Sequence, residues 1–218
     1  MSRPTCGSRE ALCAIVVGLA TIVAVPAVAQ DVARDSSDRA WTASAEIAAW
    51  ILPDQADFVL VQISADRGQL HLEGRYNYED LRTGSAWLGW SWTWGGKVPG
   101  AVSPMAGAVF GNTDGLAAGV EVDLVLGPVE LYVESEYVFD LEDSTADYYY
   151  AWSELSLSPA DWISAGFVLQ RTRIVERSSD VAAGPFLEGR AGPLGLTAYL
   201  LDPFGEERFG VIQLGLDF

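Results

Sequence analysis

The sequence predicts an all-β fold, a transmembrane antiparallel up-and-down β-barrel of twelve strands. Three observations predict it. From residue 40 onward the chain divides into segments of about ten residues in which apolar and polar side chains alternate, as in strands that present two different faces. Clusters rich in Gly, Pro and acidic residues separate these segments. The last segment ends the chain on an aromatic residue, Phe218.

The alternating segments are the expected strands, and no long amphipathic helix interrupts them. An even number is expected of a single-chain bacterial barrel. The expected strands are 40–51, 55–64, 68–79, 84–94, 100–111, 115–126, 128–140, 146–158, 161–173, 182–190, 193–202 and 207–218.

The connections between these strands fall into two classes. Those assigned to the periplasmic end are short and rich in Gly or Pro, namely 66–68, 95–100, 127–128, 158–161 and 191–193. Those assigned to the outside are generally longer, more polar and often acidic, and include 79–82, 141–147, 176–180 and 203–207. Short inner turns and longer outer loops are typical of membrane barrels.

The final segment has an apolar face and a polar or small face. The apolar face comprises Ile212, Leu214 and Leu216, and the polar or small face comprises Gln213, Gly215 and Asp217. The pattern suits a strand between lipid and a polar lumen, and it resembles the C-terminal strand of Gram-negative outer-membrane β-barrel proteins. The resemblance implies a location in the outer membrane, contact with its lipid, and a role for Phe218 in the signal that the barrel-assembly machinery reads.

The N-terminal residues 1–29 have the pattern of a secretory signal peptide. Arg3 and Arg9 precede an apolar stretch over 11–25, and Ala27 and Ala29 provide a small-x-small cleavage motif. A retained transmembrane anchor is the alternative, but the apolar run is shorter than the roughly 20 residues needed to span. The sequence therefore predicts a signal peptide over 1–29, a short polar tail over 30–39, and the barrel over 40–218.

Composition limits the chemistry of the mature chain. Both cysteines, Cys6 and Cys13, lie within the expected signal peptide, which excludes thiolate metal sites and cysteine catalysis after cleavage. The formal net charge of the full chain is −17. Such acidity argues against nucleic acid as a partner, because affinity for phosphates depends on Lys and Arg. Cations are more natural partners, although a solvated acidic surface is an equally open interpretation.

Strand parity divides the side chains of the 128–140 segment between lipid and lumen. Since charges on the lipid face cost about 2–4 kcal/mol near the midplane for Lys or Arg, and less for acids, the acidic residues are expected to face inward. The lipid-facing set is then Val129, Leu131, Val133, Tyr137 and Phe139. The expected lumen and permeation residues are Glu46, Glu73, Glu121, Asp123, Glu130, Glu134, Glu136 and Glu154.

The tight turn at 127–128 sets an expected register, with Glu121 opposite Glu134 and Asp123 opposite Tyr132. Further polar residues expected inside are His71, Arg75, Asn77, Gln170, Glu188 and Arg190. Arg75 and Arg190 are the obvious inward cations, so ion pairing does not neutralise all the acids.

Aromatic residues are expected in two places. Trp92, Trp94, Tyr137 and Phe139 are expected at the membrane interfaces. Tyr132, Tyr148, Tyr150 and Trp152 share the inward parity, where they either constrict the lumen, contact the ring of a sugar or nucleoside, or simply fill space. A soluble β-sandwich is the alternative fold, because its strands also alternate.

His71 is the single histidine and must carry any proposal of lipid hydrolysis. Its strand brings Glu73, rather than a serine, onto the same face, although Ser153, Ser156 or Ser164 are distant candidates. The alternative is a hydrogen-bonded histidine that fills the lumen. No cofactor motif, zinc-ligand spacing or calcium loop is present, and no metal site is predicted.

The sequence thus favours passive passage of small polar solutes or cations, with Glu121, Asp123, Glu130, Glu134 and Glu136 setting the charge preference. A non-conducting structural or interaction barrel and a lipid-active enzyme are the alternatives.

Overall fold

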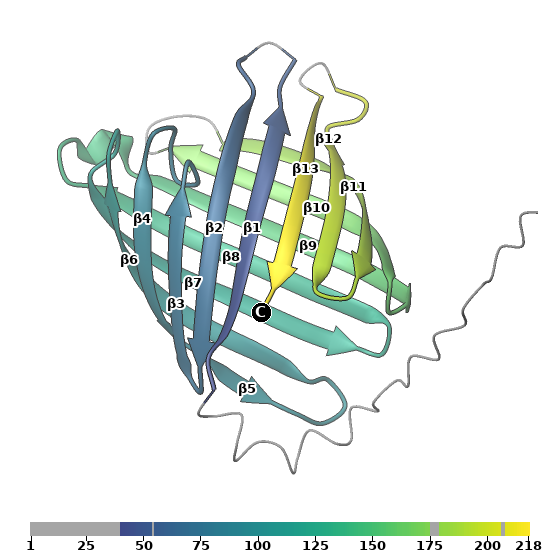
Figure 1. The fold of residues 1–218 in the computed structure, drawn as a ribbon. Coiled ribbons are helices and arrows are strands. Elements are labelled where there is room, and N and C mark those ends of the chain that lie inside the picture. The colour runs from purple at the N-terminus through teal and green to yellow at the C-terminus, as the bar shows by residue number, and fades with distance from the viewer. Residues whose placement is uncertain (1–39, 54, 175–178, 206–207) are drawn as a thin grey trace, which may run out of the picture. The chain divides into compact units, whose positions relative to one another are not determined.

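The structure, a computed structural model, describes residues 40–53, 55–174, 179–205 and 208–218. They form a single antiparallel sheet that curves round into a barrel (Figure 1). Its strands are β1 (Thr42–Ile51), β2 (Phe58–Arg67), β3 (Leu70–Tyr76), β4 (Gly84–Trp90), β5 (Trp92–Trp94), β6 (Gly100–Phe110), β7 (Gly115–Leu126), β8 (Val129–Asp140), β9 (Tyr148–Ala160), β10 (Ile163–Ile174), β11 (Ser179–Ala191), β12 (Leu194–Leu201) and β13 (Phe209–Asp217). The expected signal peptide and polar tail lie outside the described residues.

The barrel closes as a twelve-stranded structure. The first strand pairs with the last, from Ser44 opposite Asp217 to Ile51 opposite Gly210. Both β4 and β5 pair with β6, so they are two parts of one strand that is interrupted at Ser91. Among the described residues, closure leaves only the three-residue β5, which pairs with β6 alone, at a free sheet edge. The predicted barrel and its strand number are confirmed, and the soluble sandwich is excluded.

Glycines shape three of the short turns. Gly68, Gly127 and Gly192 have φ angles of 62°, 59° and 60°, and each is the first of two residues that join paired strands. A positive φ at this position is typical of a type II′ hairpin turn, which requires Gly. These turns and 95–99 and 161–162 form the short-turn end of the barrel. Most connections at the opposite end, the long-loop end, are longer, as expected. Residues 54, 175–178 and 206–207, which belong to three of these loops, lie outside the described part.

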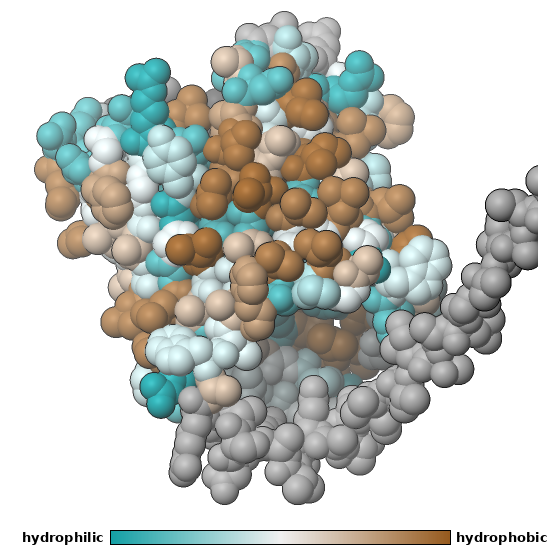
Figure 2. Space-filling model, in the orientation of Figure 1, coloured by the Kyte–Doolittle hydropathy of each residue, from teal (hydrophilic) through white to brown (hydrophobic). Residues whose placement is uncertain are grey.

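The outer surface of the barrel is largely apolar. Exposed large side chains include Ile63 at 56%, Phe167 at 69% and Leu196 at 55%, and Figure 2 shows hydrophobic residues gathered across the middle of the face formed by β1, β2, β12 and β13. An apolar outer surface of this kind is typical of a barrel whose outside faces lipid. No described residue belongs to a helix that is long and apolar enough to cross a membrane.

The interior of the barrel is partly filled by two apolar clusters. The larger comprises Ala48, Leu60, Trp152, Val168, Phe186, Tyr199, Leu201 and Val211, and the smaller comprises Trp87, Met105, Val109, Ala117 and Val138. Twelve strands enclose more space than the smallest barrels, whose side chains fill the interior. The space that remains between and beside these clusters holds the polar residues described next.

Candidate functional site

Arg75 lies at the centre of a buried cluster of carboxylates. Its Nε and one terminal nitrogen contact Glu73 Oε2 at 2.7 and 2.5 Å, and the other terminal nitrogen contacts Glu134 Oε1 at 2.8 Å and Glu136 Oε2 at 3.0 Å. A fourth carboxylate, that of Glu79, lies 3.9 Å away. The guanidinium is inaccessible to solvent and also faces the rings of Tyr78 and Trp87, at 4.3 and 4.8 Å from their centroids. One buried cation is thus shared among four acids.

The hairpin of β7 and β8 has the register expected from its turn. Glu121 lies opposite Glu134 and Asp123 opposite Tyr132, which is the pairing that the two-residue turn predicted. The Tyr132 hydroxyl donates a hydrogen bond to Glu121 at 3.0 Å. Glu134 is only 2% exposed, which places its carboxylate in the barrel interior.

His71 is held by carboxylates on both sides of its ring. Nδ1 lies 2.7 Å from Asp66 and Nε2 lies 3.0 Å from Glu73, with Glu121 at 3.9 Å. These hydrogen bonds agree with the interpretation of His71 as a bonded interior residue. Among the described residues, no serine hydroxyl hydrogen-bonds to His71. His71, Glu73 and Glu121 are close enough together to share a metal ion, but Glu73 is already bound by Arg75.

The structure corrects the predicted outer loop over 79–82. The loop begins at Asn77, and Glu79 points into the barrel. Strand β3 ends at Tyr76, because Asn77 adopts a φ of 58° and its Oδ1 accepts a hydrogen bond from the backbone of Arg82 at 2.7 Å. This turn directs Glu79 inward, where its carboxylate accepts hydrogen bonds from Ser85 Oγ and from Trp87 Nε1. The neighbouring Tyr78 also points inward and donates to Glu134. Continuing the alternation of His71, Glu73 and Arg75 would also place Glu79 inward, but it would place Tyr78 outward. The inward position of Tyr78 therefore depends on the turn at Asn77.

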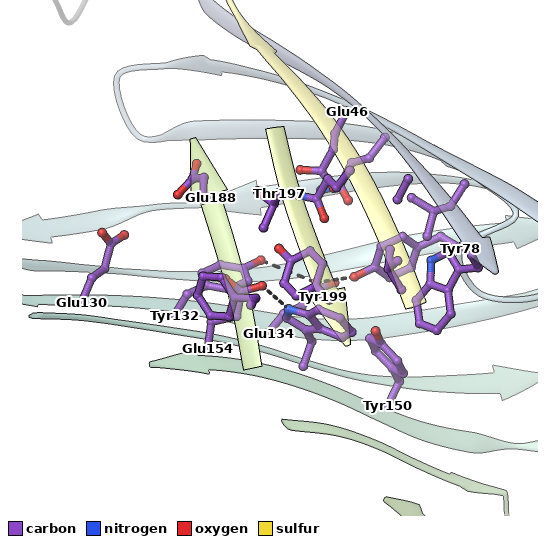
Figure 3. Close-up of a pocket in the computed structure, with 18 of the residues that line it drawn as sticks. Glu46, Tyr78, Glu130, Tyr132, Glu134, Tyr150, Glu154, Glu188, Thr197 and Tyr199 are labelled. Atoms are coloured by element: carbon purple, nitrogen blue, oxygen red, sulfur yellow. Dashed lines mark hydrogen bonds between the residues drawn. The ribbon is translucent and has the colours of Figure 1, made fainter. Parts of the chain in front are cut away.

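A cavity of about 270 Å³, the inner chamber, lies beside the Arg75 cluster. Its acidic wall comprises Glu46, Asp123, Glu130, Glu134, Glu154 and Glu188, and its aromatic wall comprises Trp50, Tyr78, Tyr132, Tyr150, Trp152, Phe186 and Tyr199. Figure 3 shows Glu130 and Glu188 toward one side of this chamber and Tyr78 and Tyr150 toward the other. Toward the short-turn end it adjoins a cavity of about 390 Å³ that shares Glu130 and Arg190.

A second cavity, the outer chamber, has a volume of about 470 Å³ and is bordered by the long loops. Its acidic residues are Glu79, Asp80, Glu136 and Asp143, and no described Lys or Arg lines it. Asp143 accepts hydrogen bonds from the Thr145 hydroxyl at 2.7 Å and backbone at 3.0 Å. These bonds hold the pKa of the Asp143 carboxyl below its usual value, so this group is ionised at neutral pH.

Four residues line both chambers and therefore lie between them. They are Trp50, Leu60, Tyr78 and Tyr150, which we call the partition. The Tyr78 and Tyr150 rings meet edge to face with centroids 5.9 Å apart, and Trp50 stacks on Phe58 and Phe209 with both centroids at 5.5 Å. Tyr150 belongs to the predicted inward aromatic set, whereas the roles of Trp50 and Tyr78 were not anticipated.

The structure places all eight acids of the predicted lumen set inside the barrel. Glu46, Asp123, Glu130, Glu134 and Glu154 line the inner chamber, Glu73 and Glu136 bind Arg75, and Glu121 lies near His71. The predicted interface aromatics face outward, with Trp92 49%, Trp94 40% and Phe139 48% exposed, and Tyr137 packs against Phe139 at 4.6 Å. The role of these four residues as membrane anchors stays a prediction.

Two solved structures of the KdgM porin are similar to this chain. One has a TM-score of 0.58 at 10% identity, and the other, a complex with disordered oligogalacturonate, has a TM-score of 0.61 at 9% identity. Each alignment covers 80% of this chain and 99% of the porin. No protein-family profile and no curated protein sequence matches the chain. At such low identity the likeness establishes the architecture, and the chain has the fold of a porin-type outer-membrane β-barrel.

Proposed function

We propose that the barrel is a narrow channel for small polar solutes or cations. The observation that carries this proposal is the pair of acidic chambers on either side of the partition. A barrel whose only requirement was stability would gain more from apolar filling, since buried charges are costly unless they are paired. The fold shared with the KdgM porin supports the same function.

The charges on the chamber walls favour cations. Six acids line the inner chamber, and Arg190, the one cation among its described lining residues, is paired with Glu188 at 2.6 Å. Rings or patches of carboxylates raise the local concentration of cations. Oligogalacturonate, which one KdgM porin structure contains, is a chain of anionic sugars. Acidic chambers would repel such a ligand, so we infer that the solute of this barrel is neutral or positively charged.

The partition makes the proposed passage narrow. Trp50, Tyr78 and Tyr150 occupy the position between the chambers, and the Tyr78 hydroxyl is anchored to Glu134. A solute must pass these rings or displace them. We therefore expect a conductance well below that of the 16- to 18-stranded porins, whose lumen is an open aqueous channel.

A non-conducting interaction barrel is the second candidate, and the two interior apolar clusters favour it. Val138 and Leu201 are completely buried inside the barrel, so part of the interior acts as a packed core. In this alternative the long loops make the functional contacts, and the acids around Arg75 only fix the arrangement of the strands.

Conductance of the refolded protein in a planar lipid bilayer distinguishes the two candidates. A channel gives discrete current steps, and its reversal potential in a KCl gradient has the sign of a cation-selective pore. A bilayer that stays sealed, although the protein has inserted in its folded form, would rule out the channel and leave the interaction barrel. Anion selectivity would contradict the proposal that the acidic walls of the chambers favour cations.

A further inference from the structure

The outward face of the barrel carries two arginines on one strand. Arg171 and Arg173 of β10 share the parity of Phe167, and all three residues are exposed. Val168, which has the opposite parity, lies in the larger interior cluster. Within the strands of the described part, Arg67, the last residue of β2, is the one other charged residue at an outward position. Since charge on the lipid-facing side is costly in the middle of a membrane and tolerated near its borders, the height of the two arginines along β10 decides what they meet.

The two arginines lie at the height of the lipid headgroups. Trp162, in the short turn before β10, is 63% exposed, as expected of a tryptophan at a membrane interface. Arg171 follows nine residues later. A strand that rises about 3.3 Å per residue and tilts by about 40° climbs about 23 Å over this length, close to the roughly 25 Å height of the apolar band of a barrel. Trp162 and Arg171 therefore lie at opposite borders of this band, with Phe167 between them.

Tyrosines lie beside the arginines at the same height. The backbone register places Arg173 opposite Tyr149 of β9, and Tyr149 opposite Tyr137 of β8. Tyrosine is enriched at the membrane–water interface, where its amphipathic ring sits at the level of the headgroups. The Tyr149 hydroxyl accepts a hydrogen bond from Ser135 Oγ at 3.0 Å. Because a hydroxyl is also a donor, the proton of Tyr149 remains for an acceptor on the outer side of the sheet.

We propose that Arg171, Arg173 and Tyr149, which we call the arginine patch, bind the phosphate group of a lipid in the leaflet at the long-loop end. Arginine presents a planar fork of N–H donors that matches the oxygens of a phosphate. Alternate residues on one face of a strand are about 7 Å apart, so both guanidinium groups can reach the same phosphate.

The surroundings of the arginine patch favour a lipid over a soluble anion. Phe167 and Leu169, which continue the same face of β10 toward the middle of the barrel, are 69% and 46% exposed and can contact the acyl chains of a lipid whose headgroup lies on the arginines. The chain as a whole has a formal net charge of −17, so it repels soluble anions at long range. A lipid is already held against the barrel by its acyl chains.

Lipid titrations of the refolded full chain in detergent, followed by native mass spectrometry, test this proposal. Dimyristoyl phosphatidic acid and dimyristoylglycerol have the same acyl chains and differ only in the phosphate. We expect the phosphatidic acid to bind at least tenfold more tightly, and equal binding of the two lipids would overturn the proposal. Inorganic phosphate is the third probe. It should leave the bound phosphatidic acid in place at equal concentration, whereas complete displacement would show a site for free anions and not for a lipid.

Removal of the two arginines identifies where the lipid binds. Arg171→Gln combined with Arg173→Gln should weaken the binding of phosphatidic acid at least tenfold and leave dimyristoylglycerol unchanged. Arg82→Gln combined with Lys97→Gln is the matched control, because it removes the same charge from exposed turns outside the strands and should alter neither lipid. Unchanged binding of phosphatidic acid by the first double variant, or equal losses in the two double variants, would overturn the proposal.

Two further variants separate the geometry of the arginine patch from its charge. Arg171→Lys combined with Arg173→Lys keeps the charge but not the planar fork, so its affinity for phosphatidic acid should lie between those of the unmodified protein and the glutamine variant. Tyr149→Phe removes only the hydroxyl and should weaken phosphatidic acid about threefold, a loss of roughly one hydrogen bond. Each variant is compared after its folded form is confirmed by heat-modifiable gel mobility, and the comparison of the two lipids on the unmodified protein needs no variant. Since the arginine patch lies on the outer face, lipid binding and ion conduction can succeed or fail independently.

Discussion

The guanidinium of Arg75 on β3 donates a hydrogen bond of 3.0 Å to the carboxylate of Glu136 on β8, across the interior of the barrel and 61 residues away in the sequence. The same nitrogen contacts Glu134. Two strands that share no backbone hydrogen bonds are therefore joined through one charged side chain. Because buried charges are costly when left without a partner, this contact makes a clear prediction about stability.

Replacing Arg75 with Met should destabilise the barrel by about 3–5 kcal/mol, because it leaves several buried carboxylates without their cation. Urea unfolding of the refolded protein, followed by tryptophan fluorescence, measures the change. Arg190→Met is the matched control: the side chain of Arg190 is 56% exposed and its ion pair lies near the short-turn end, so a loss within about 1 kcal/mol is expected. Similar losses for the two variants would show that Arg75 does not hold the interior together.

The membrane-facing assignment predicts that Phe167→Arg impairs folding into lipid. Phe167 lies within β10 and is 69% exposed, and an arginine there costs about 2–4 kcal/mol if the position is near the bilayer midplane. Leu141→Arg is the control, since Leu141 is equally exposed at 68% but lies in a long loop. The folded fraction in lipid vesicles should fall for the first variant only. Equal tolerance would mean that the β10 surface does not meet lipid.

Deletion of Phe218 should reduce assembly in cells while leaving the fold intact. The backbone N–H of Phe218 donates to the Ala43 carbonyl at 2.8 Å, at the outermost position of the pairing between β1 and β13, and its ring is 70% exposed. The residue contributes little packing, so the truncated chain should refold normally in detergent. If the truncated protein reaches the same level in the outer membrane of cells as the intact protein, a role of Phe218 in assembly is contradicted.

Much of this fold could be predicted from the sequence because a transmembrane strand has to separate lipid-facing from lumen-facing residues. The alternation in β7 and β8, with the two-residue turn at Gly127, was sufficient to place Glu121 opposite Glu134. Gly and Pro at the short turns limited the strand boundaries to within a few residues.

The site was less predictable, because its geometry depends on contacts between distant strands and on one departure from regular structure. At the positive φ of Asn77 the chain departs from the strand, and Tyr78 points into the lumen together with Glu79, whereas strand parity would place Tyr78 outside. The ion pairs of Arg75 with Glu134 and Glu136 likewise depend on the distance between β3 and β8 across the barrel interior. The sequence therefore predicted the inward position of the strand acids, but it predicted neither the inward position of Tyr78 nor which of the interior residues bind one another.

If the barrel conducts, removing two rings of the partition should raise its conductance. Tyr78→Ala combined with Tyr150→Ala deletes the edge-to-face pair between the two chambers, so we expect larger current steps in planar bilayers. Tyr149→Ala is the control, because Tyr149 lies next to Tyr150 on the opposite face of β9, where its hydroxyl accepts a hydrogen bond from Ser135. Unchanged conductance in the double variant would place the constriction elsewhere in the lumen.

Cation selectivity should depend on the acids that face the inner chamber and bind no arginine. Glu134 and Glu136 are poor choices for this test, because neutralising them would expose the charge of Arg75. Glu46 and Glu130 line the chamber without such a contact, so Glu46→Gln combined with Glu130→Gln should reduce the cation preference while leaving the barrel folded. Glu142→Gln, in an exposed loop, should have little effect.

Salt concentration provides a second check on the same pair of residues. The Debye length falls from about 30 Å at 0.01 M to about 10 Å at 0.1 M, so carboxylates on the chamber wall act on permeating ions most strongly in dilute salt. Reversal potentials of the unmodified protein should therefore show a cation preference that weakens as salt rises, and the double variant should differ from it most at the lowest concentration. A preference that is independent of salt, or identical in the two proteins, would mean that steric constriction at the partition, rather than the charge of Glu46 and Glu130, decides which ions pass.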